Sequence, residues 1–122
     1  MSDLDAARRV AQTLPRAYQV HVRSRLKFRV GSLVFASFTL DEEIMGFGFP
    51  KEQREGLVAA EPLKFLLPEP VDLRYNWVRV RLAAVDDDEV RELVIDSWRM
   101  CVPKKLSRAL DESLGLAADE RS

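Results

Sequence analysis

The sequence predicts an α+β fold, a two-layer α/β sandwich of order α-β(3)-α-β(2)-α whose mostly antiparallel sheet carries its helices on one face. Two patterns lead to this prediction. Apolar and polar side chains alternate over residues 22–40 and 76–82, with the period of two that is typical of half-buried strands. Over residues 86–102, apolar side chains recur every three or four positions, as on the buried stripe of a helix.

The first predicted element is a short helix over residues 6–14, which ends at Pro15. Two strands follow, over residues 22–30 and 33–40, and a turn joins them into a hairpin. The first strand alternates apolar side chains with four basic ones, Arg23, Arg25, Lys27 and Arg29. This hairpin therefore has one apolar and one cationic face.

The register of the hairpin follows from the length of its turn. A two-residue loop at Gly31 and Ser32 would place the apolar side chains of the second strand on the cationic face. A loop of odd length, with Gly31 at a positive φ, instead places on the apolar face Val34, Ala36, Phe38 and Leu40. We expect the odd loop, which leaves on the cationic face Phe35, Ser37 and Thr39.

A third strand is predicted over residues 44–49, and Pro50 then begins a polar helix that ends near Pro62. The proline-rich residues 63–73 can hold one short edge strand. Residues 76–82 alternate again, so they form the last predicted strand.

The long helix over residues 86–102 begins at an acidic cap, Asp86, and bends or ends at Pro103. We expect residues 1–114 to form a single domain and residues 115–122 to be a disordered tail. One more short helix is indicated between them by Leu106 and Leu110.

Composition excludes several classes of protein. The net charge of −1 argues against bulk electrostatic coating of DNA, although residues 1–40 hold seven basic and only two acidic side chains. One cysteine, Cys101, and one histidine, His21, exclude an internal disulfide and multi-cysteine or histidine-rich metal sites. We expect no cofactor. Without a signal peptide or a long apolar run, we expect a cytoplasmic protein that does not enter a membrane.

The sequence also resembles the MmcQ/YjbR-like family over roughly residues 10–106. The blocks that carry the resemblance are FRVGSLVFASF at 28–38, the Pro50 helix with Pro62-Leu63-Lys64-Phe65, Asn76-Trp77-Val78, and DDEVRELVIDSW at 87–98. The resemblance implies an α-β(3)-α-β(2)-α sandwich related to secretion-chaperone-like folds, with a double-wing motif. It also implies DNA binding, and it supplies no catalytic residues.

The first candidate site is the cationic face of the sheet. Cations interleaved with aromatic rings on an open sheet can bind phosphates and stack bases. The alternative is a solvated face whose arginines pair with Glu61, Glu69 or Asp72. The expected nucleic-acid-binding side chains on this face are Arg23, Arg25, Lys27, Arg29, Phe35, Trp77, Arg79 and Arg81.

A second candidate site is a wing formed by the hairpin tip at Gly31-Ser32 together with Lys104 and Lys105. A loop tip can enter a groove of DNA while lysines contact phosphates. The alternative is that both lysines complement the C-terminus of the preceding helix.

Other features favour structural roles. Asp86, Asp87 and Asp88 lack the spacing and glycine of a calcium loop and are better explained by helix capping. His21 has no evident nucleophile partner, and Cys101 lies on the apolar helix stripe. No pair or triad of reactive side chains has diagnostic spacing, so we do not expect an enzyme.

The first functional hypothesis is therefore a non-enzymatic DNA- or nucleic-acid-binding domain, monomeric or weakly dimeric. The second is an adaptor that binds a protein partner, as a chaperone does, and has no nucleic-acid ligand. It would use an exposed apolar patch formed by Phe47, Phe49, Leu63 and Phe65.

Overall fold

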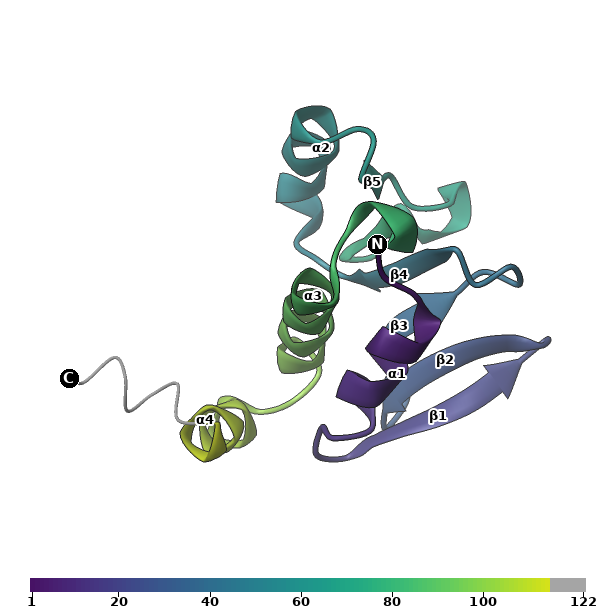
Figure 1. Cartoon of the computed structure of the whole chain (residues 1–122). Coiled ribbons are helices and arrows are strands. Elements are labelled where there is room, and N and C mark those ends of the chain that lie inside the picture. Colours follow the sequence, from purple (N-terminus) through teal and green to yellow (C-terminus); the bar gives the residue numbers. More distant parts are fainter. Residues whose placement is uncertain (115–122) are drawn as a thin grey trace.

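The computed structural model describes residues 1–114, so the predicted tail at 115–122 lies outside the described residues (Figure 1). The predicted α+β class is confirmed: helices pack against a six-stranded antiparallel sheet. The elements, with two short 3-10 helices labelled η, are α1 Leu4–Ala11, β1 Ala17–Val22, β2 Arg25–Val30, β3 Leu33–Phe38, β4 Ile44–Gly48, α2 Lys51–Ala60, β5 Phe65–Leu66, η1 Pro70–Asp72, β6 Trp77–Arg81, η2 Leu82–Ala84, α3 Asp87–Arg99 and α4 Lys104–Ser113.

The sheet has the strand order β1-β2-β3-β4-β6-β5, with every neighbouring pair antiparallel. Strand β1 is one strand more than the sequence analysis predicted. It lies at the edge of the sheet and none of its residues is buried, so it lacks the buried alternation that marks the inner strands. Arg23 and Ser24, both at positive φ (52° and 69°), form the tight turn from β1 to β2. Arg23 is therefore a turn residue, and its predicted place in a strand is wrong.

The β2–β3 hairpin combines a two-residue turn with a bulge. Gly31 has the predicted positive φ, 60°, but Val30 pairs with Leu33, so the predicted odd loop is wrong. The register shifts farther along the strands: Arg29 pairs with Val34, whereas Phe28 pairs with Ala36. Phe35 is the extra residue of this bulge.

The bulge overturns part of the predicted register. Ala36 and Phe38 do lie on the apolar face, as predicted, because the bulge restores the alternation. Val34 instead lies beside Arg29 on the cationic face. Phe35 is fully buried, with its ring centroid 6.2 Å from that of Phe28, so its predicted place on the cationic face is wrong.

A single hydroxyl on α3 holds the bulge. Ser97 Oγ donates to the carbonyl of Phe35 at 2.6 Å and accepts from the backbone N–H of Gly48 at 2.7 Å. Ser97 and Phe35 are fully buried, so no water replaces the hydrogen bond to the Phe35 carbonyl. The contact ties α3 to both β3 and β4.

The core lies between the sheet and helices α1 and α3, which Figure 1 shows together on one side of the sheet. Trp98 of α3 is fully buried and donates through Nε1 to the carbonyl of Pro15 at 2.9 Å. It packs with the other large buried side chains, Phe28, Phe35, Phe38, Met45 and Phe47. No helix among residues 1–114 is long and apolar enough to span a membrane.

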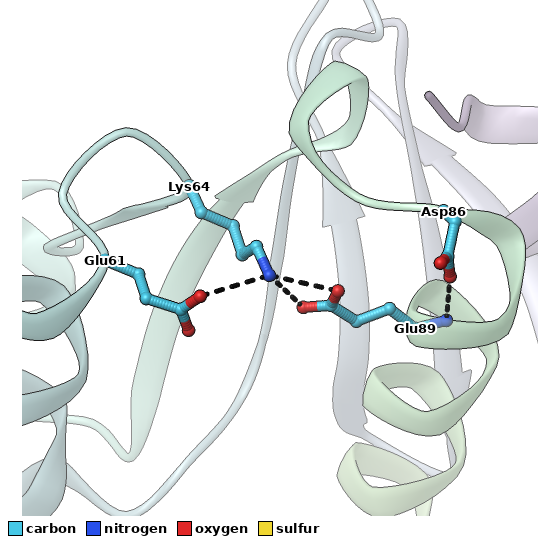
Figure 2. A network of polar contacts seen from close by, with 4 residues as sticks. All are labelled: Glu61, Lys64, Asp86 and Glu89. Carbon is cyan, nitrogen blue, oxygen red and sulfur yellow. Dashed lines mark hydrogen bonds and ion pairs between the residues drawn. The ribbon is translucent and has the colours of Figure 1, made fainter.

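Lys64 links the segment after α2 to the first turn of α3 (Figure 2). Its Nζ lies 2.9 and 3.1 Å from the carboxylate oxygens of Glu89 and 3.2 Å from that of Glu61. The predicted cap is present, because Asp86 Oδ1 accepts from the backbone N–H of Glu89 at 2.8 Å. The hydrogen bonds from Lys64 to Glu89 and Glu61 hold the pKa of Lys64 above its ordinary value, and the bond to Glu89 has the larger effect.

Ser97→Ala is expected to destabilise the fold by about 1–3 kcal/mol, because it leaves the buried carbonyl of Phe35 and the partly buried N–H of Gly48 without their partner. Urea denaturation measures the change. Ser32→Ala, at an exposed turn residue, is the control and is expected to have little effect. Equal effects of the two substitutions would contradict the role of Ser97.

Glu89→Gln is expected to lower the pKa of Lys64, measured by NMR titration of its side-chain methylene groups. The folded pKa of Lys64 is raised, so its charged form stabilises the fold fully below the unfolded pKa of about 10.4. This stabilisation is lost as pH rises through the folded pKa. An unchanged pKa in the variant would show that the ion pair is not formed in solution.

Candidate nucleic-acid interface

One row of side chains crosses the helix-free face of the sheet. Directly paired residues of neighbouring strands share a face. Lys27 of β2 pairs with Val20 of β1 and with Ser37 of β3. Ser37 pairs in turn with Gly46 of β4, and Gly46 with Arg79 of β6. Lys27 thus stands on the face opposite the buried core, as predicted.

Part of this face is hollowed. The larger hollow has a volume of ≈ 440 Å³ and lies between the β2–β3 hairpin and residues 72–77. It is lined by Lys27, Ser32, Leu33, Val34, Ser37, Asp72, Tyr75, Asn76 and Trp77. A smaller hollow of ≈ 50 Å³ shares three of these residues, Ser37, Asp72 and Trp77, and adds Arg25 and Arg79 among others. Residues 69–76 therefore form a wall over a face that the sequence predicted to be fully open.

Trp77 lines both hollows, and its ring lies over Gly46, which has no side chain. A Cβ atom at Gly46 would lie 2.6 Å from Nε1 of Trp77 and 2.8 Å from Cε2 and Cζ2 of the ring. The indole therefore rests directly against the β4 backbone. Trp77 is partly exposed, in agreement with its predicted place on this face.

The two arginines of β6 are largely engaged in structure. Arg79 donates through Nε to the carbonyl of Leu67 at 3.0 Å and pairs with Glu69 at 3.2 Å. Arg81 donates to the carbonyl of Pro62 at 3.2 Å. Both hold the segment around β5 against the sheet. The alternative of a solvated, ion-paired face is therefore correct for Arg79 and Glu69.

The cations of β2 are different. The side chains of Arg25 and Lys27 have no hydrogen bond or ion pair with residues 1–114. Arg29 lies between Tyr18 and Val34, and its Nε is buried without a partner among the described residues. On this face of the sheet, the basic side chains without a partner among the described residues are therefore those of β2.

The remaining predicted site residues lie elsewhere. Arg23 is at the exposed tip of the β1–β2 turn, and Phe35 is in the core. Lys104 and Lys105 are exposed, but they begin α4 and do not complement the C-terminus of α3, which ends at Arg99. The alternative given for these lysines, that they complement the end of α3, does not hold, because Pro103 separates the two helices. The wing itself stays a prediction.

Two features of the face were not predicted. Tyr18 is half exposed, pairs with Arg29 and donates through its hydroxyl to the carbonyl of Gly31. Its strand could have been indicated only by a weak alternation, of Val20 and Val22 with Gln19 and His21. Tyr75 is also half exposed and lies under the guanidinium of Arg74, 4.8 Å from ring centroid to Cζ. No short-range pattern marks Tyr75, because it lies in a loop.

A buried arginine fixes the wall that carries Tyr75 and Trp77. Arg54 of α2 donates to the carbonyls of Tyr75 at 2.9 Å and Trp77 at 3.4 Å, and also to that of Leu73. Only 9% of Arg54 is exposed, and no carboxylate contacts it among residues 1–114. Its charge is therefore stabilised by backbone carbonyls, which holds residues 73–77 in one conformation.

The apolar patch expected for an adaptor is not formed. Phe47 and Phe65 are 1% and 3% exposed, and Phe49 packs partly buried against the core. Only Leu63 of the four is strongly exposed. The predicted patch is therefore wrong, because its aromatic residues belong to the core.

Other reactive groups lie away from the two hollows. Within residues 1–114, no three histidine, cysteine, aspartate or glutamate side chains gather to hold a metal ion. His21 is exposed on the edge strand β1. Partial burial raises the pKa of the Cys101 thiol, which disfavours the reactive thiolate.

Comparison with known proteins agrees with this architecture. The YjbR family model matches residues 12–100. The chain belongs to the YjbR family. The YjbR fold here is also similar to the crystal structure of Deinococcus radiodurans protein DR2400, whose description names the domain DUF419. The TM-score is 0.71 at 25% sequence identity, over 95% of this chain and 90% of that one. No curated protein matches the chain.

Gly46→Ala is expected to displace Trp77 and destabilise the fold by about 1–3 kcal/mol, because the new methyl group overlaps the indole. Urea denaturation and tryptophan emission measure the two effects, and the buried Trp98 supplies a constant background. The control, Gly56→Ala, has open space around it in helix α2 and is expected to stabilise by up to about 1 kcal/mol. Unchanged emission in Gly46→Ala would contradict the close contact with Trp77.

Proposed function

We propose that this YjbR-family protein is a non-enzymatic nucleic-acid-binding domain, and that it binds a single-stranded segment across the helix-free sheet face. The observation that carries the proposal is the pair of unpartnered cations Arg25 and Lys27, each of which lines a hollow together with Trp77. Proteins that bind single strands combine a cationic track for the phosphates with aromatic rings for the bases.

The shape of the face favours a single strand over a duplex. The bases of a single strand are free to turn toward an aromatic ring, whereas those of a duplex are already stacked on one another. Tyr18 and Trp77 lie on either side of the β2 cations along the strand order. A strand that crosses β1 to β6 would meet aromatic, cationic and again aromatic side chains.

The chemistry of the hollows supports a binding role without catalysis. Neither hollow is lined by a histidine or a cysteine that could act as a general base or a nucleophile. Within residues 1–114, no hydrogen bond joins His21 to a serine or cysteine.

The double variant Arg25→Glu/Lys27→Glu is expected to weaken binding of single-stranded DNA at least about tenfold and to reduce its salt dependence. Fluorescence anisotropy with a labelled oligonucleotide at two salt concentrations measures both. The matched control is Lys104→Glu/Lys105→Glu, which makes the same change of charge at the exposed start of α4.

The two double variants separate the sheet face from the wing. A loss confined to the β2 variant supports the sheet face. A loss confined to the α4 variant would assign the contact to the wing, and equal losses would indicate only nonspecific attraction. If wild-type protein binds no oligonucleotide at low salt, the proposed function is wrong.

A further inference from the structure

An unpartnered carboxylate stands among the cations of the proposed binding face. Asp72 lines both hollows and is partly buried at the end of η1. Its carboxylate has no hydrogen bond or ion pair with residues 1–114, although its neighbour Glu69 pairs with Arg79. Asp72 is thus available to a ligand.

A carboxylate on such a face discriminates among ligand groups. It repels a phosphate, and it can only accept hydrogen bonds. Guanine presents two adjacent donors, N1–H and the 2-amino group, to a bidentate acceptor. Adenine and cytosine place a ring acceptor beside their amino group, and thymine has a single N–H donor between two carbonyls. Of the four bases, guanine therefore fits a carboxylate best.

We propose that the larger hollow binds one guanine base of a single-stranded nucleic acid, a specificity that rests on the proposed function. Asp72 accepts from N1–H and the 2-amino group of guanine. Trp77 and Tyr75 supply aromatic surface for the base, and Lys27 contacts the adjoining phosphate. The volume of ≈ 440 Å³ lies within the range of about 300–1,000 Å³ typical of ligand pockets.

The wall that carries the carboxylate is held in place before any ligand arrives. The backbone N–H of Asp72 donates to the carbonyl of Glu69 at 2.8 Å, and the carbonyl of Asp72 accepts from the N–H of Tyr75 at 3.0 Å. Arg54 fixes the following residues, and the ion pair with Arg79 fixes Glu69. Little conformational freedom of this wall is lost on binding, which favours selectivity.

The test compares a short oligothymidine with the same oligothymidine carrying one central guanine, adenine or hypoxanthine. Hypoxanthine lacks the 2-amino group of guanine. Wild-type protein is expected to bind the guanine oligonucleotide at least about fivefold tighter than the adenine one, with hypoxanthine between them. Asp72→Asn is expected to abolish this preference and to retain binding of oligothymidine.

Asp88→Asn is the matched control, because it makes the same change at an exposed residue of α3. It is expected to keep the guanine preference. Thermal unfolding checks that both variants are folded, and Asp72 has no side-chain hydrogen bond whose loss would unfold the chain.

The outcomes distinguish the two proposals. If every oligonucleotide binds equally, or if Asp72→Asn keeps the guanine preference, the guanine site is wrong and the proposed function stands. If no oligonucleotide binds to wild-type protein, the proposed function is wrong and the guanine site with it.

Discussion

The hydroxyl of Ser97 joins the two layers of this protein at the point where the sheet is irregular. It satisfies the buried carbonyl of the bulge residue Phe35 and the partly buried N–H of Gly48. A regular β2–β3 hairpin with the same two-residue turn would turn the apolar side chains of β3 toward the cations. The bulge prevents this, and it is stable because α3 supplies a partner for its carbonyl.

The bulge also determines which side chains lie next to one another on the proposed binding face. Beyond the bulge, Lys27 stands opposite Ser37, and the row continues through Gly46 to β6. The bulge also removes Phe35 from the face, so the aromatic surface comes instead from Trp77 and from residues outside the predicted strands. Free cations lie on β2, whereas the wall at residues 69–76 brings the carboxylates. One side of the face therefore carries basic side chains and the other side carries acidic ones.

The sequence predicts the fold class well because helix and strand periods are properties of short segments. It also places Arg25, Lys27 and Trp77 on the correct face for the same reason. It fails at Phe35, because the partner of the bulge, Ser97, lies 62 residues away along the chain. It indicates Glu69 as a possible partner of the arginines, but it misses the backbone carbonyls that bind Arg79 and Arg81, since these belong to a loop without periodicity. Tyr18 is missed because an exposed edge strand has a weak pattern.

The contact between Gly46 and Trp77 has an evolutionary consequence. With tryptophan at position 77, any side chain at position 46 meets the indole ring. Replacement of Trp77 by a smaller residue removes that obstacle and makes larger residues acceptable at position 46. The two positions are therefore epistatic, and the order of substitutions matters. If Trp77 is first replaced by a smaller residue and Gly46 is then replaced by a larger one, a single substitution back to tryptophan at position 77 would no longer fit.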